Sequence, residues 1–127
     1  MAGLKKKAWK LLSEVIRREA ANPDGTVQCY TCWNNWHWKQ HIQAGHAIPG
    51  RNGAVLLDED VIRPQCVQCN IWMRGNYPFF TTRLIKEKGM EWWESKLLSA
   101  KQVKKWTRGE LEAKCEEYRT RLAALGP

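Results

Sequence analysis

The sequence predicts an α+β protein in which a zinc-bound unit of two strands and one helix forms the core and further helices flank it. Two Cys-x-x-Cys pairs, Cys29/Cys32 and Cys66/Cys69, predict one metal site. The segment between the pairs has short aromatic and β-branched stretches broken by glycines, as in a hairpin. The segments outside the pairs have the apolar spacing of amphipathic helices.

A single domain is expected, because 127 residues supply one modest core and no low-complexity linker divides them. We expect an N-terminal helix over residues 1–22, the zinc-bound core over 23–76 and C-terminal helices over 77–127. The turn signal NPDG ends the first helix. Its apolar side chains recur every three or four residues: Leu4, Ala8, Leu11, Leu12, Val15 and Ile16.

The central hairpin is expected between Val27 and Leu57. Its strands are predicted at about residues 41–48 and 54–57, where apolar and β-branched side chains flank a loop. The loop is PGRNG at 49–53, whose glycines suit a turn.

Helices are expected over most of the remaining chain. A short one runs from about Val67 to Arg74, and GNYP at 75–78 breaks it. Two more are predicted over about 79–88 and over MEWWESKLLSA (90–100).

The last helix is expected to follow Thr107. Thr107 and Glu110 have the spacing of a capping box, in which each side chain bonds the other residue's backbone N–H. One face of this helix is predicted to carry Leu111, Cys115, Tyr118 and Leu122.

Four thiolates match the tetrahedral preference of zinc, and the x-x spacing lets each pair bind from one tight turn. A site with four protein ligands has no position for water, so the zinc is expected to be structural and to tie the hairpin to the helix after it. The alternatives are a redox Cys-x-x-Cys pair or buried thiols without metal. The fifth cysteine, Cys115, is expected to be an ordinary helix residue.

The charge balance favours a polyanionic partner. Lysine and arginine number 21 against 13 aspartates and glutamates, a formal net charge of +8. Nucleic acid is therefore the first partner to consider, and a basic surface that only aids solubility is the alternative. The N-terminal stretch is charged throughout and no apolar run could span a bilayer, so we expect a cytoplasmic protein without a membrane partner.

The order of motifs resembles a known family. "AGH" at 44–46 and "QCVQCNIWMRGN" at 65–76 resemble the HNH, or ββα-metal, nuclease motif. The full order C-x-x-C, AGH, DED, QC-x-x-CN and GN is similar to the phage NinG (Rap) recombination proteins, over about residues 29–98. The resemblance implies a metal-dependent endonuclease that cuts branched DNA, such as Holliday junctions, during phage recombination in the bacterial cytoplasm.

The resemblance also implies roles for individual residues. His46 matches the general base, and Asn70 matches a ligand of a catalytic Mg²⁺ or Mn²⁺. Arg74 is expected one turn after Asn70, on the same helical face, where it could hold a phosphate oxygen. The alternatives are a strand-end histidine without function at His46 and a helix cap at Asn70.

Two positions depart from the broader HNH pattern. Gly45 stands where many such nucleases have a metal ligand, and Val61 stands where they have an asparagine that binds the histidine loop. The missing cation ligand must come from elsewhere. The nearest candidates are Gln43, Asp58 and Asp60, although the two aspartates are also common turn residues.

Basic and aromatic side chains complete the predicted DNA surface. Phosphate contacts are expected from Arg51, Arg63, Arg74, Lys5, Lys6 and Lys7, with a solvated helix face as the alternative for the lysines. Trp33, Trp36 and Trp38 lie beside the first cysteine pair, where they either fill a small core or stack on unpaired bases.

Branched DNA is thus the expected substrate, and a homodimer is expected because resolving a junction takes two symmetric cuts. Two other functions remain open. One is a non-catalytic zinc module that binds junctions or single strands, and the other is an HNH endonuclease that acts on duplex DNA.

Overall fold

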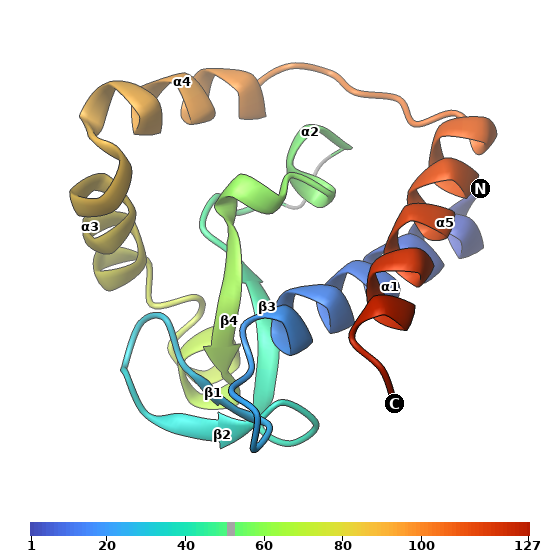
Figure 1. Ribbon diagram of the computed structural model, residues 1–127. Helices are drawn as coiled ribbons and strands as arrows, with labels where there is room; N and C mark the ends of the chain where they lie inside the picture. Colours follow the sequence, from blue (N-terminus) through green and yellow to red (C-terminus); the bar gives the residue numbers. More distant parts are fainter. Residues whose placement is uncertain (51–52) are drawn as a thin grey trace.

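The structure, a computed structural model, describes residues 1–50 and 53–127 (Figure 1). It has mixed α+β architecture, with two small antiparallel sheets at one end and helices around them. The predicted class of helices combined with small sheets is confirmed. Helices α3 and α4 form one arm in Figure 1, and the paired helices α1 and α5 form the other.

The N-terminal helix α1 (Ala2–Glu19) packs against the C-terminal helix α5 (Arg108–Ala124). The apolar spacing of α1 places one row of side chains inward, so the predicted amphipathic helix is confirmed. This row and the inner face of α5 form a core with Ala44 and Ile62 of the second sheet. The fully buried members from the two helices are Ala8, Leu12, Val15, Leu111 and Tyr118.

The first hairpin carries the first cysteine pair. Strands β1 (Thr26–Gln28) and β2 (Asn35–His37) pair antiparallel, and the cysteines lie in the turn between them. The Cys29 N–H donates to the Asn34 carbonyl oxygen at 2.8 Å, which closes this turn. The sequence analysis predicted a metal-binding turn here but no strands, because each strand has only three residues.

The second hairpin differs from the predicted one. Strand β3 (Ile42–His46) pairs with β4 (Ile62–Cys66). The predicted strand at 54–57 is wrong: helix α2 (Gly53–Leu56) lies there, followed by the 3₁₀ turn η1 (Glu59–Val61). The partner of β3 is therefore β4, in which Ile42 pairs with Cys66, and this pairing places Cys66 in the cysteine cluster.

The helix after the second cysteine pair is short and wide. Residues Gln68–Trp72 form the π-helical turn η2, in place of the helix expected from Val67 to Arg74. Arg74, Gly75 and Asn76 then all adopt positive φ, which ends the turn. Gly75 is needed here because an added Cβ would also lie 2.7 Å from the Tyr77 ring.

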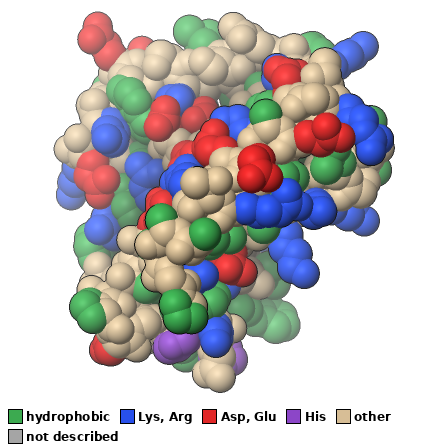
Figure 2. All heavy atoms as spheres, turned by 45° about the vertical axis from the view of Figure 1, so that its right-hand side comes forward, with side chains coloured by type: hydrophobic (Ala, Val, Ile, Leu, Met, Phe, Trp, Pro, Cys, Tyr) green, Lys and Arg blue, Asp and Glu red, His purple; other side chains and the backbone are tan. Residues whose placement is uncertain are grey.

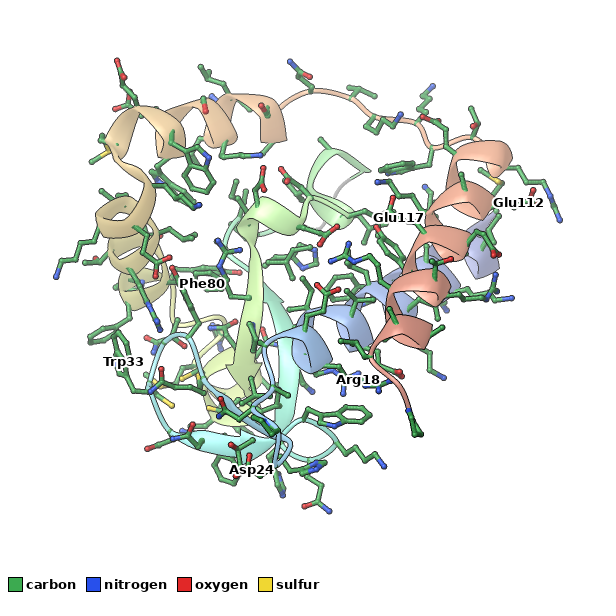
Figure 3. The ribbon with its side chains drawn as sticks, viewed as in Figure 1. Arg18, Asp24, Trp33, Phe80, Glu112 and Glu117 are labelled. Atoms are coloured by element: carbon green, nitrogen blue, oxygen red, sulfur yellow. The ribbon has the colours of Figure 1, made fainter. Side chains whose placement is uncertain are left out.

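Two helices follow, at the expected places, and Figure 1 shows them at a steep angle to one another. Helix α3 (Tyr77–Lys88) and helix α4 (Met90–Ala100) meet at Gly89 and bury Phe80, Leu84 and Trp93 in a second core. Figure 3 shows the labelled Phe80 pointing inward from α3. The capping box at the start of α5 is confirmed: Thr107 Oγ1 accepts from the Glu110 N–H, and Glu110 Oε1 accepts from the Thr107 N–H.

Candidate metal centre and the adjoining cavity

The four paired cysteines form one cluster. Among the described residues, the Sγ atoms of Cys29, Cys32, Cys66 and Cys69 lie within 4.8 Å of one another. Cys32 Sγ and Cys66 Sγ are 3.6 Å apart. In a tetrahedron with Zn–S bonds of about 2.3 Å the sulfurs are about 3.8 Å apart, so the cluster suits a zinc ion.

Neighbouring groups donate hydrogen bonds to the sulfurs, as expected around a thiolate ligand. Cys66 Sγ accepts from the Cys69 N–H, and Cys69 Sγ accepts from Asn76 Nδ2 at 3.6 Å. Burial alone opposes ionisation of Cys29, but hydrogen bonds from the backbone and from Thr31 outweigh it and bring its pKa to about 6. A zinc ion bound here would therefore find at least one ligand already ionised at neutral pH.

A cavity of about 330 Å³ is lined in part by Asn70, the residue that follows Cys69 of the cluster. Its walls come from α1, from β3 and the loop after it, from η2 and from the start of α3. The side chains that matter for chemistry are His46, Asn70 and Arg74, with Trp9 and Tyr77 beside them. The structure thus brings the predicted base, the predicted ligand and the predicted phosphate contact to one cavity.

His46 lies at the end of β3 and is held from two sides. Its Nε2 is 3.1 Å from the carbonyl oxygen of Leu56, and its ring centroid is 4.6 Å from that of Trp9. A carbonyl oxygen can only accept, so Nε2 carries the proton. The other nitrogen, Nδ1, is therefore unprotonated in the neutral ring and can act as a base.

Asn70 lies on η2, immediately after Cys69. Its Nδ2 donates to Gln43 Oε1 at 2.8 Å, so Gln43 orients the Asn70 amide. Asn70 and Gln43 also line a second cavity of about 300 Å³ with Trp9 and Ser13. Gln43 thus lies beside the predicted cation ligand, as expected from its place on β3.

Asp58 and Asp60 do not join this site. Both accept hydrogen bonds from Lys96 Nζ, at 3.1 Å and 2.7 Å respectively, and Asp58 also caps η1. The hydrogen bond from Lys96 lowers the pKa of Asp60, which keeps this ion pair charged. The chain turns at η1 and directs both carboxylates toward Lys96 of α4, and neither of them lines the cavity that contains His46.

The two departures from the HNH pattern have structural explanations. Gly45 is needed because an added Cβ would overlap the side chain of Gln65 on the paired strand. Val61 cannot bind the histidine loop through its side chain, but its carbonyl oxygen accepts from the Ala47 N–H at 2.8 Å. The main chain therefore fixes the residue that follows His46.

The predicted phosphate contacts are dispersed. Lys6 and Lys7 are exposed on α1 and Lys5 is half-buried. Arg63 Nη1 donates to the Glu59 and Ile62 carbonyl oxygens, and Arg51 lies outside the described residues. Figure 2 shows acidic and basic side chains next to one another on the face that it displays, so the net positive charge forms no uniform patch there.

Arg74 lines the cavity, but its backbone conformation differs from the predicted helical one. It follows η2 with a φ of 52° instead of sharing a helical face with Asn70. A non-glycine residue with positive φ is strained, and such residues often lie at functional sites.

The tryptophans divide between packing and exposure. Trp38 packs against α1, where the Arg18 guanidinium lies 5.1 Å from its ring centre. Trp33 is exposed but lies against Arg83 of α3, and Figure 3 shows it at the outer edge of the first hairpin. Trp36 is also exposed.

The sequence analysis missed Trp9 as a site residue. Trp9 is half-buried and lies next to Ala8 of the apolar row of α1. The stretch on which the family resemblance was based did not include α1. Trp72 on η2 was also missed, and 74% of it is exposed to solvent.

Among the described residues, no helix is long and apolar enough to cross a membrane. A sequence model of the family described as "Bacteriophage Lambda NinG protein" matches residues 2–126. Searches of curated proteins and of solved structures gave no match.

Proposed function

Because the chain belongs to the bacteriophage lambda NinG family, which its match over residues 2–126 shows, we propose that it is a metal-dependent endonuclease that cuts branched DNA during phage recombination. The observation that carries the proposal is the position of His46 and Asn70 on one cavity beside the four-cysteine cluster. A base and an oxygen ligand on the same cavity are what an HNH-like hydrolysis of DNA requires.

In the proposed reaction, His46 is the general base. The Leu56 carbonyl oxygen holds the proton on Nε2, so Nδ1 accepts a proton from the attacking water. The water oxygen bonds to phosphorus as the bond from phosphorus to the 3′ oxygen breaks. The leaving 3′ oxygen takes a proton from solvent water, so the products are a 5′-phosphate and a 3′-hydroxyl.

Asn70 and Arg74 bind the scissile phosphate region in this proposal. The Asn70 amide oxygen suits a hard cation, and Gln43 holds the amide in place through Nδ2. A bound Mg²⁺ or Mn²⁺ would supply Lewis acidity that offsets charge on the phosphate and on the leaving 3′ oxygen. Arg74, which lines the same cavity, would supply a guanidinium for a non-bridging oxygen.

Zinc at the four cysteines has a structural role in the proposal. The four cysteines would hold the ion and would leave no position for water or DNA in a tetrahedral site. Because Cys69 is one of them, the adjacent Asn70 would be held relative to the strand that carries His46.

Two further features support DNA as the partner and a dimer as the active form. The net charge of +8 favours a polyanion. Exposed apolar side chains on α3 and α4, including Phe79 and Leu98, offer a surface for a second copy. Two copies would supply the two symmetric cuts that a four-way junction requires.

A cleavage assay tests the function. The zinc-bound protein is incubated with a four-way junction and with a duplex of matched sequence, each with Mg²⁺, Mn²⁺ or EDTA. We expect cuts in the junction only, dependent on Mg²⁺ or Mn²⁺, and we expect His46→Ala to reduce the rate by at least about a hundredfold while junction affinity is kept.

The alternatives predict other results. Cutting of both substrates indicates an HNH nuclease for duplex DNA, and a retarded but intact junction indicates a non-catalytic binding module. A normal cleavage rate in His46→Ala would show that another group is the base.

A further inference from the structure

Gln65 on β4 has a buried amide whose two ends are in different surroundings. Its Nε2 donates to Thr31 Oγ1 at 3.0 Å and to the Gly75 carbonyl oxygen at 2.8 Å. Among the described residues, no donor reaches its Oε1, although the residue is 0% exposed. A buried oxygen without a donor is costly, and an ordered water or a bound ion would satisfy it.

The orientation of this amide is fixed. The Gly75 carbonyl oxygen can only accept, so the NH₂ end of Gln65 must face it. Rotating the amide by half a turn would place Oε1 against that carbonyl oxygen and leave it without a hydrogen bond. The unpaired Oε1 therefore points to the other side, toward β3.

Oε1 lies where a side chain at position 45 would begin. An added Cβ on Gly45 would overlap Gln65 Oε1 and would lie 3.1 Å from Asn70 Oδ1. Gly45 has no positive φ, so the backbone itself would allow other residues there. Two amide oxygens from different elements thus border one point beside Gly45, the position at which the HNH pattern has a cation ligand.

We propose that Gln65 Oε1 is a ligand of the divalent cation, together with Asn70 Oδ1, and replaces the ligand that Gly45 cannot supply. This proposal rests on the proposed function for the cation itself. Mg²⁺ and Mn²⁺ are the fitting ions because they prefer oxygen ligands. The other candidates fit less well: Gln43 Oε1 already accepts from Asn70, and Asp58 is paired with Lys96.

The charge of this pair of ligands has a consequence. Both amides are neutral, whereas sites for Mg²⁺ usually include carboxylates or phosphates. The phosphate of bound DNA therefore supplies the negative oxygen, and cation and DNA strengthen each other's binding by the same factor.

Titration of Mn²⁺ into the zinc-bound protein, followed by electron paramagnetic resonance of the free ion, tests the site without any cleavage. His46→Ala is present throughout to keep the DNA intact, and the titration is repeated with a four-way junction. We expect tighter Mn²⁺ binding with the junction than without it. Gln65→Met, which keeps the chain length but removes the oxygen, should weaken Mn²⁺ binding by about tenfold or more.

A rescue experiment tests whether Gln65 acts as a cation ligand or only stabilises the structure. Gln65→Ala vacates the space beside Gly45, and Gly45→Asp in that background returns an oxygen to it from the other strand. We expect the double variant to regain Mn²⁺ binding, although it regains neither hydrogen bond of the Gln65 amide. The control is Asp60→Asn, which lies outside the cavity and should leave Mn²⁺ binding unchanged.

The unmodified chain supplies a measurement that does not depend on variant folding. Mn²⁺ below one equivalent should broaden the side-chain amide resonances of Gln65 and Asn70 in a ¹⁵N spectrum, while those of Gln28 stay sharp. Sharp Gln65 resonances beside broadened Asn70 resonances would overturn the proposal. Mn²⁺ binding that is unchanged in Gln65→Met would overturn it as well.

Failure here is distinguishable from failure of the proposed function. If Mn²⁺ binding depends on Gln65 but no junction is cut, the cation site stands and the nuclease proposal falls. If junctions are cut with Mg²⁺ while Gln65→Met binds Mn²⁺ normally, the nuclease stands and the Gln65 ligand falls.

Discussion

The contacts of His46 determine the orientation and the protonated nitrogen of its ring. The Leu56 carbonyl oxygen determines which ring nitrogen carries the proton, and the Trp9 ring covers one face of the imidazole. Neither partner needs a charge to do this. The orientation of the proposed base therefore depends on helix α2, which ends at Leu56, and on helix α1, two helices outside the strand that carries it.

At this scale we predict that Trp9→Ala slows junction cleavage by about 10- to 100-fold, because the imidazole loses the ring that holds it in line with the phosphate. Trp9→Phe retains a ring and should keep most of the rate. Single-turnover cleavage measures the effect, and a gel-shift titration checks that junction affinity is kept. Equal rates for Trp9→Ala and the unaltered protein, with both folded, would show that the stacking has no part in catalysis.

The four-cysteine cluster brings together several short elements of the chain. Cys29 and Cys32 come from the β1–β2 turn, Cys66 ends β4, and Cys69 lies on η2. Each of these elements has five residues or fewer. Short strands and a single π-helical turn gain little from their own hydrogen bonds, so a metal bound at the four cysteines would add to the contacts that hold them in one arrangement.

We predict that one zinc ion binds per chain and that its removal by a chelator lowers the thermal midpoint by roughly 10–20 °C, since structural zinc contributes several kcal/mol to folding. Cobalt substitution should give the absorption bands of tetrahedral thiolate coordination. Cys66→Ser should lose the metal, whereas Cys115→Ala, which removes the cysteine outside the cluster, should keep it. A chain that retains its midpoint after complete metal removal would contradict a structural role.

The sequence predicts a residue's place where a motif ties it to the cysteine cluster. It does not predict the conformation of a segment that depends on packing against distant parts of the chain. The second cysteine pair predicts where Asn70 lies, because the residue after Cys69 cannot be far from the cluster. The stretch AVLL suits a strand as well as a helix, and only the pairing of Ile42 with Cys66 decides that it is helical. Gln65 was missed because its importance depends on the missing side chain of Gly45 on the other strand.

At the scale of the whole molecule, both ends of the chain support the site. Helix α1 contributes Trp9 to the cavity, and α5 holds α1 through Arg121, which binds Glu19 of α1 and Glu59 of η1. These hydrogen bonds raise the pKa of Arg121, so the guanidinium stays charged. Helices α3 and α4, in contrast, leave apolar side chains exposed.

We predict a dimer formed through these exposed side chains. Sedimentation should give two chains per particle, either free or on a four-way junction, because Phe79 and Leu98 are 61% and 66% exposed. Leu98→Glu should shift the particle to one chain and reduce paired cuts more than single cuts. As a control, Trp72→Ala removes an exposed apolar side chain of η2 and should leave the dimer intact. A monomer under both conditions would remove this prediction.

The pairing of α1 with α5 also orders events during synthesis. The ribosome releases α1 before α5, so the core between them cannot close until α5 has also emerged. Until then α1, which carries Trp9, lacks the helix that it packs against. A nascent chain that ends before α5 would therefore carry an incomplete cavity wall.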